Sequence, residues 1–327
     1  AQAQTTIEPG SEDSASSSGD DAGYASDDYS STSTSLSSSV RDYAFENGRR
    51  YHKFRQGHYA LPNDDQEQHR EDMKHAMTLA ASGDRLHFAP LNAHPQQIVD
   101  LGTGTGIWAV EMGDAYPSAQ VLGIDLSPIQ PTWVPPNVRF MVDDAESEWL
   151  HPRDHFDLVH ARHCLPAFKD WAGVFASAFA HVKPGGWMEV QDLQFVSQCD
   201  DGTMPETYAL EKLFRLIGAG FQTMGVTLQG APSLPEKMRA AGFEGVEVDV
   251  RKVPVGKWPK NPLLKKVGLY LQAVIMDGLE AVSLGPICRG LKWTREEVEV
   301  LLAEVRKDLR NSAIHSYVTM YTIYGQK

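Results

Sequence analysis

Cysteine is scarce in this chain of 327 residues, and long runs of apolar residues are absent. The three cysteines, Cys164, Cys199 and Cys288, are odd in number and far apart, which argues against a disulfide framework or a thiolate zinc site. No stretch approaches the roughly 18 unbroken apolar residues of a membrane-spanning helix. The first residues also lack the basic and then apolar pattern of a secretory signal. We therefore expect an intracellular protein, cytoplasmic or nuclear, with no membrane partner.

Positive charge is also in short supply, since the formal net charge is −13. Residues 1–40 contain seven acidic residues and no Lys or Arg. An acidic surface repels phosphate backbones, so we expect no direct nucleic-acid partner. This segment is rich in Ser and Asp and poor in large apolar side chains, so it buries too little surface to offset the entropy of ordering. We expect a disordered tail over residues 1–40 and one folded domain over residues 41–327.

The folded part alternates short apolar strands with helical patterns, as a mainly parallel sheet requires. The expected strands are 97–101, 120–125, 138–142, 156–161, 186–191, 246–253 and 317–324. Helical additions at about 204–230 and 260–310 break the alternation, and Thr294 with Glu297 predicts a capping box there. Added elements usually cover the ligand crevice of such a sheet. The fold class predicted is α/β and Rossmann-like.

The strongest local signal is the glycine-rich turn Asp100 to Gly106, which follows a strand and precedes a helix. Glycine permits the backbone angles and the close approach to a ligand that such a turn needs. Ile107 occupies the position where a dinucleotide fingerprint requires its third glycine, which counts against NAD and FAD. Asp100 just before the turn favours a ligand with an ammonium group over a pyrophosphate. S-adenosylmethionine has an ammonium group and no phosphate.

Acidic residues follow the next two strands. Asp125 ends the second strand, 19 residues after Gly106, where a carboxylate accepts hydrogen bonds from both hydroxyls of a ribose. Asp144 and Ala145 follow the third strand and offer an acceptor and a backbone donor to an adenine edge. Each aspartate taken singly is also explained as a turn or capping residue. Taken in order with Asp100, they predict contacts with ammonium, ribose and base.

These motifs resemble the class I S-adenosylmethionine-dependent methyltransferases, and within them the LaeA-like methyltransferases of filamentous fungi. The resemblance rests on Tyr51 to Tyr59, Leu61 to Asp64, Val99 to Trp108, Gly123 to Pro136, Val142 to Trp149, Phe156 to Arg162 and Lys183 to Gly186. It spans about residues 48–327 and is weakest after residue 200. It implies a seven-stranded sheet with an antiparallel last strand, S-adenosylmethionine as cofactor, S-adenosylhomocysteine as product, and methyl transfer to a small molecule or a protein.

The resemblance also implies roles for particular residues. Gly102, Thr103 and Gly104 would contact the methionine part, Asp125 and Leu126 the ribose and adenine, and Asp144 and Ala145 the adenine edge. An N-terminal segment would close over the cofactor. Together with Asp100, the predicted cofactor-binding set is completed by Tyr51, Arg55 and Tyr59 of that segment and by Ala161 at the end of a strand.

A general base is optional in an in-line methyl transfer, because positioning and exclusion of water supply much of the catalysis. His163, just after the strand 156–161, is the best-placed candidate base, with Glu189 and Asp192 as second choices. His151, His155, His160 and His163 straddle a loop and a strand, so we expect no metal site.

Two alternatives to an active methyltransferase remain at this point. One is a LaeA-like regulator of secondary metabolism that acts mainly through protein partners. The other is a nicotinamide oxidoreductase, which shares the strand, glycine turn and helix and the ribose-type Asp125.

Overall fold

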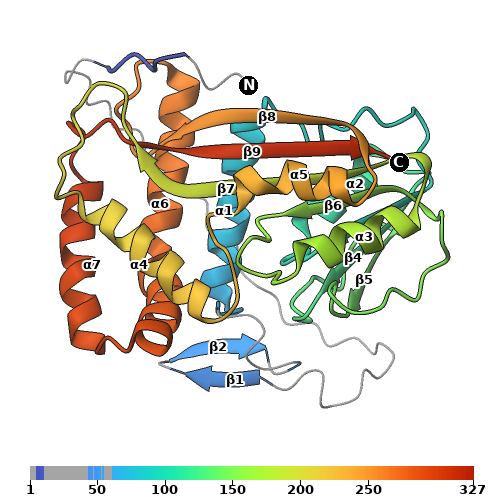
Figure 1. Ribbon diagram of the computed structural model, residues 1–327, viewed down its shortest axis with the longest axis horizontal. Helices are drawn as coiled ribbons and strands as arrows, with labels where there is room; N and C mark the ends of the chain where they lie inside the picture. Colours follow the sequence, from blue (N-terminus) through green and yellow to red (C-terminus); the bar gives the residue numbers. More distant parts are fainter. Residues whose placement is uncertain (1–4, 11–42, 47, 53, 55–60) are drawn as a thin grey trace.

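A seven-stranded sheet forms the centre of the computed structural model, which describes residues 5–10, 43–46, 48–52, 54 and 61–327 (Figure 1). The strand order is β5-β4-β3-β6-β7-β9-β8. All pairs from β5 to β7 are parallel, whereas β9 is antiparallel to both neighbours. The strands are β3 Gln97–Leu101, β4 Gln120–Asp125, β5 Val138–Val142, β6 Phe156–Arg162, β7 Val182–Gln198, β8 Glu244–Pro254 and β9 Tyr317–Gln326. The predicted fold class is confirmed.

Helices pack on both faces of the parallel half of the sheet. Within β3, Ile98 packs in a cluster with Trp108 of one helix, whereas Val99 packs in a second cluster with Phe175 of another. Alternate residues of a strand point to opposite faces, which explains this division. The helices are α1 Asp65–Ser82, α2 Ile107–Ala115, α3 Trp171–His181, α4 Ala209–Thr223, α5 Leu234–Ala240, α6 Pro262–Leu284 and α7 Arg295–Leu309.

The helical additions pack together with α1 beside the long strands β7 and β9 (Figure 1). α7 begins at the predicted capping box, in which Thr294 and Glu297 each bind the other's backbone N–H. β7 is much longer than the predicted strand 186–191 because β9 pairs with it as far as Gln198. The hairpin of β1 Tyr43–Glu46 and β2 Arg49–His52 was not predicted.

α6 and the π-helical turn Gly285–Gly290 that follows it form one continuous helix, Pro262–Gly290. By length and composition alone, this helix is long and apolar enough to cross a bilayer. Half of its most apolar window is buried inside the protein. Its buried residues, Val267, Leu271, Ile275 and Leu279 among them, belong to the core shared with α1, α4 and α7. The packing is that of a core helix.

Residues 5–10, within the predicted tail, contact the folded domain. The backbone N–H of Gly10 donates to the carbonyl oxygen of Trp258 over 2.7 Å, and that of Lys260 donates to Glu8 over 2.8 Å. The side chains of Lys260 and Glu8 form an exposed ion pair at 3.0 Å. The sequence did not predict this contact, and the rest of the tail lies outside the described residues.

Candidate functional site

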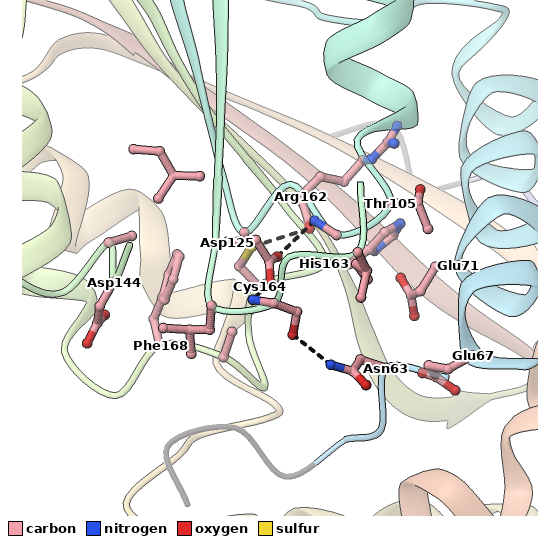
Figure 2. Close-up of a pocket in the computed structure, with 18 of the residues that line it drawn as sticks. Asn63, Glu67, Glu71, Thr105, Asp125, Asp144, Arg162, His163, Cys164 and Phe168 are labelled. Atoms are coloured by element: carbon pink, nitrogen blue, oxygen red, sulfur yellow. Dashed lines mark hydrogen bonds between the residues drawn. The ribbon is translucent and has the colours of Figure 1, made fainter. Parts of the chain in front are cut away.

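A cavity lies at the carboxyl ends of β3, β4 and β6, where α1 and the loop after β6 complete its wall (Figure 2). We call it the strand-end cavity. Its empty space is about 930 Å³ with the open mouth included. Seven residues predicted from the sequence line it, namely Gly102, Gly104, Asp125, Leu126, Asp144, Ala145 and His163.

Glycine is required at two positions of the turn for different structural reasons. Gly104 has a φ of +58°, and its backbone N–H donates to Oδ2 of Asp125 over 2.9 Å. A Cβ on Gly104 would meet no protein atom within 4 Å, so it would project into the cavity that Gly104 lines. A Cβ on Gly106 would lie 2.4 Å from Cζ of Phe140 in β5. Gly104 therefore leaves room for a ligand, whereas Gly106 allows the turn to pack against the sheet.

Asp125 is held in place by backbone donors. Its Oδ1 accepts from the N–H of Ser127 over 2.8 Å, and its Oδ2 accepts from Gly104. Burial raises the pKa of Asp125 to about 6 in spite of these two bonds. Each carboxylate oxygen has a further lone pair that a ligand hydroxyl would satisfy.

Asp144 and Ala145 lie in the loop after β5, and both line the strand-end cavity. Oδ1 of Asp144 accepts from the N–H of Glu146 over 2.9 Å, which orients the carboxylate. Figure 2 shows Asp144 and Arg162 on opposite sides of Asp125. In this view Asp144, Asp125 and Arg162 follow one another across the cavity that all three line.

Asp100 has two partners within the protein. Thr103 Oγ1 donates to its Oδ2 over 2.6 Å, and His160 Nδ1 bonds to its Oδ1 over 2.7 Å while the imidazole stacks on Trp108. Asp100 and Thr103 border a smaller space, which shares Arg162 and other residues with the strand-end cavity. Asp100, which was predicted to bind an ammonium group, thus also links the glycine turn to β6 through Thr103 and His160.

Arg162, the last residue of β6, lines both spaces. Its Nη2 donates to Nδ1 of His75 in α1. Burial, together with the charges of Arg162 and His160, lowers the pKa of His75 to about 3, so the imidazole accepts as a neutral ring. Nη1 of Arg162 is buried and has no hydrogen-bond partner in the described part of the chain. A guanidinium with an unused donor at a cavity wall fits a carboxylate group of a ligand.

Of the candidate bases, His163 is among the described residues that line the strand-end cavity, and Glu189 is not. Burial and the charges of Lys74 and Arg162 lower the pKa of His163 well below its ordinary value, so the ring is neutral. Glu189 accepts from the backbone N–H groups of Phe88 and Ala89, which makes it a structural residue. Asp192 lines a second cavity, described below.

The remaining predicted residues have other surroundings. Tyr51 pairs with Ala44 in the β1–β2 hairpin and is not among the described residues that line the strand-end cavity. Arg55 and Tyr59 lie outside the described residues. Ala161 is fully buried in β6 and lies between Leu101 of β3 and Val190 of β7. His151 stacks on His155, at 6.1 Å between ring centroids, whereas His160 and His163 bond to Asp100 and Thr78.

Comparison with known proteins gives a consistent family. Residues 69–248, more than half of the chain, match the family described as "Methyltransferase domain". Methyltransferase pytC of Aspergillus terreus is 41% identical over 301 residues, covering 92% of this chain and 93% of that protein. Protein-methionine methyltransferase laeA of Emericella nidulans is 34% identical over 286 residues, covering 86% of this chain and 76% of that protein. The chain belongs to the methyltransferase family. It is an enzyme of that class, with relatives among fungal proteins of secondary metabolism.

A solved structure of Haemonchus contortus phosphoethanolamine N-methyltransferase 2 is similar over 78% of this methyltransferase and 52% of that chain, with 20% identity and a TM-score of 0.45. A likeness of this degree adds nothing to the family assignment.

Several groups that line the strand-end cavity were not predicted from the sequence. Arg162 was included in the strand motif but received no role, although a charged residue at the carboxyl end of a central parallel strand is a signal of ligand contact. Asn63 and Ser127 were also missed, and Asn63 Nδ2 donates to Ser127 Oγ over 3.2 Å. Glu67 and Glu71 lie four residues apart on α1, so both carboxylates face the cavity.

Proposed function

We propose that this methyltransferase binds S-adenosylmethionine in the strand-end cavity and transfers its methyl group to an acceptor that enters beside His163. The observation that carries the proposal is the row of Asp144, Asp125 and Arg162 across one cavity (Figure 2). An adenine amino group, two ribose hydroxyls and an amino-acid carboxylate follow one another in the same order along S-adenosylmethionine.

Each of these three polar groups would have a partner in that ligand. Arg162 Nη1 would bind the carboxylate, Asp125 would accept from the ribose, and Asp144 would accept from the adenine amino group. Apolar side chains complete the wall around the base, namely Ile124, Leu126, Ile129 and Phe168. When bound, the cofactor supplies an electrophilic methyl group on a sulfonium and leaves as S-adenosylhomocysteine.

The charge of the cavity argues against a nicotinamide dinucleotide. Six carboxylates line it, from Glu67, Glu71, Asp125, Asp143, Asp144 and Glu146, against one guanidinium from Arg162. The carboxylates of Glu67 and Glu71 are paired with Arg70 and Lys74 of α1, so the other four carry most of the effect on a ligand. Lys74 and Arg70 hold the pKa of Glu71 below its ordinary value although burial opposes this, so Glu71 is ionised. A pyrophosphate would be repelled by these groups. A cationic sulfonium and an ammonium group would be attracted.

Isothermal titration of the purified chain with S-adenosylmethionine, S-adenosylhomocysteine and NADH tests the assignment. We expect micromolar binding of the first two ligands and none of NADH. Asp125→Ala removes the ribose acceptor, and we expect it to weaken the binding of S-adenosylhomocysteine at least tenfold. Asp277→Ala, on α6 and away from the lining residues, is the matched control. Tight binding of NADH, or an unchanged affinity in Asp125→Ala, would contradict the proposal.

The acceptor is the finer question. The relatives are named as a methyltransferase of unspecified acceptor and as a protein-methionine methyltransferase, and related proteins are named as regulators of secondary metabolism. We favour a small-molecule acceptor over a protein acceptor or a purely regulatory role, because a second cavity adjoins the first.

A further inference from the structure

A second cavity lies between α1, α4 and α6, with about 740 Å³ of empty space when its open mouth is included. We call it the helical chamber. Its wall is almost wholly apolar and comes mainly from α4 and α6, which contribute Leu213, Phe214, Ile217, Val274, Ile275 and Leu279. A largely apolar wall with a few polar groups is typical of sites for small organic molecules.

The helical chamber and the strand-end cavity share two walls. On α1, Glu67 and Glu71 face the strand-end cavity, whereas Arg70 and Lys74 face the helical chamber. These four residues are spaced three or four apart, so they lie on one face of α1, and that face borders both spaces. His163 lines both cavities. The boundary between the two cavities therefore lies at His163.

The cations on the chamber side of α1 are already paired. Arg70 bonds to Glu67 over 3.0 Å, and Lys74 Nζ lies 2.6 Å from a carboxylate oxygen of Glu71. These ion pairs lower the net charge offered to an occupant, so the chamber is suited to a neutral molecule. The ionisable groups left on its wall are Asp192 and His163.

His163 presents a free lone pair. Thr78 Oγ1 donates to the carbonyl oxygen of Lys74 over 2.9 Å, so it accepts from Nε2 of His163, 3.1 Å away. In a neutral ring the proton is then on Nε2, and Nδ1 is an acceptor. The residue also has a φ of +58°, a conformation that non-glycine residues seldom adopt outside functional or turn positions.

Asp192, in β7, is fixed by the backbone. The N–H groups of Leu165 and Leu193 donate to its two carboxylate oxygens over 2.8 and 2.9 Å. Burial raises the pKa of Asp192 to about 7. A carboxylate of this basicity in an apolar chamber is suited to accept a proton near neutral pH.

We propose, on the basis of the function above, that the helical chamber binds a neutral, largely apolar small molecule and that Asp192 and His163 hold its hydroxyl group at the boundary with the strand-end cavity. The hydroxyl oxygen forms a bond to the methyl carbon of the cofactor. The carbon–sulfur bond breaks, and its electron pair stays on sulfur to give the thioether. The hydroxyl proton passes to the carboxylate of Asp192, and the product is a methyl ether.

Equilibrium dialysis with two probes tests the chamber. 2-Naphthol is apolar and neutral at pH 8 and has one hydroxyl, and naphthalene is the same skeleton without it. The full chain is saturated with S-adenosylhomocysteine, and the affinity for each probe is measured. We expect 2-naphthol to bind at least tenfold more tightly than naphthalene, and Asp192→Asn to reduce this ratio several-fold, because an amide accepts less strongly than a carboxylate. A merely structural role of Asp192 would leave the ratio unchanged.

Ile275→Trp fills the chamber from α6, and Leu269→Trp places the same side chain on the exposed face of that helix. We expect a tenfold loss of 2-naphthol affinity in the first variant and no change in the second. Ile217→Phe on α4 is a smaller change, which serves if Ile275→Trp does not fold. Retained affinity for S-adenosylhomocysteine shows that each variant is folded.

The outcomes separate the two proposals. Loss of S-adenosylhomocysteine binding in the unmodified chain would overturn the proposed function itself. Normal S-adenosylhomocysteine binding without binding of either probe would overturn the chamber proposal and favour a protein side chain as acceptor. Equal affinities for the two probes, or 2-naphthol binding that Ile275→Trp leaves unchanged, would also overturn it.

Discussion

Asn63 Nδ2 donates a hydrogen bond to Ser127 Oγ over 3.2 Å, which ties the segment before α1 to the loop after β4. The same Asn63 accepts from Arg50 of the β1–β2 hairpin, through its Oδ1 over 3.2 Å and its carbonyl oxygen over 2.7 Å. Ser127 in turn donates its backbone N–H to Asp125. A continuous chain of contacts therefore joins the N-terminal hairpin to the carboxylate assigned to the ribose.

Asn63→Ala should weaken the binding of S-adenosylhomocysteine about fivefold. The variant removes a buried hydrogen bond worth about 1 kcal/mol, which holds Ser127 and thereby Asp125 in place. Isothermal titration measures the effect. Asn92→Ala is the matched control, because Asn92 is exposed and its side chain accepts from the N–H of His94, two residues along the chain. Equal losses in both variants would argue against the contact chain.

The parallel half of the sheet could be predicted from the sequence because its strands are short apolar runs bounded by turn residues. The ends of β3, β4 and β5 agree with the prediction to the residue. The length of β7 could not be predicted, since residues 192–198 are strand only because β9 pairs beside them. The capping box of α7 was predictable because its signal is local.

In the site, too, the residues with a local sequence signal were predicted, and those that depend on tertiary contacts were not. Gly104, Asp125 and Asp144 follow strands at recognisable spacings, and all three line one cavity. The partners of Asp100 were not predictable, because His160 reaches it from a neighbouring strand, 60 residues away in the chain. The sequence predicted helices that cover the crevice but not the helical chamber between them. The wall of the chamber depends on how α4 and α6 pack against α1.

Gly104→Ala should reduce the affinity for S-adenosylhomocysteine at least tenfold, because its Cβ projects into the strand-end cavity. It should also lower the free energy of unfolding by about 1 kcal/mol through its positive φ. Gly225→Ala is the control, since Gly225 has a φ of +80° and a Cβ there meets no atom within 4 Å. Thermal melts should show similar losses of stability in both variants. Titration should show weakened binding only in Gly104→Ala, and an equal effect of both would contradict the assignment.

The affinity for S-adenosylhomocysteine should fall as the pH falls through about 6. Ribose hydroxyls donate to the ionised form of Asp125, whose pKa burial raises to about 6. Above that pH the carboxylate is already ionised and the affinity is constant. Below it, binding must displace a proton, and the dissociation constant should rise up to about tenfold between pH 6 and pH 5. Titrations at pH 5 to 8 measure this profile, and Asp125→Asn should flatten it. A wild-type profile without a step near pH 6 would contradict the role of Asp125.

Arg162→Gln should separate the two halves of the cofactor. Arg162 is assigned to the carboxylate of the ligand, and a hydrogen bond to a charged group is worth about 1.5–3 kcal/mol, so S-adenosylhomocysteine should bind roughly 10- to 100-fold more weakly. 5′-Methylthioadenosine contains the adenine, the ribose and the sulfur but lacks the amino-acid part. Its affinity should stay within about twofold of the wild-type value, because its contacts with Asp125 and Asp144 are unchanged. Arg162→Lys keeps the charge and should recover part of the loss.

The comparison of the two ligands also controls for damage to the fold. Arg162 bonds to His75 of α1 as well as facing the cavity, so its loss also removes a contact between β6 and that helix. If Arg162→Gln merely loosened the structure, both ligands would lose affinity by similar factors. A selective loss for S-adenosylhomocysteine assigns the guanidinium to the amino-acid end of the cofactor, which fixes the direction of the ligand in the cavity and brings its sulfur toward the boundary at His163.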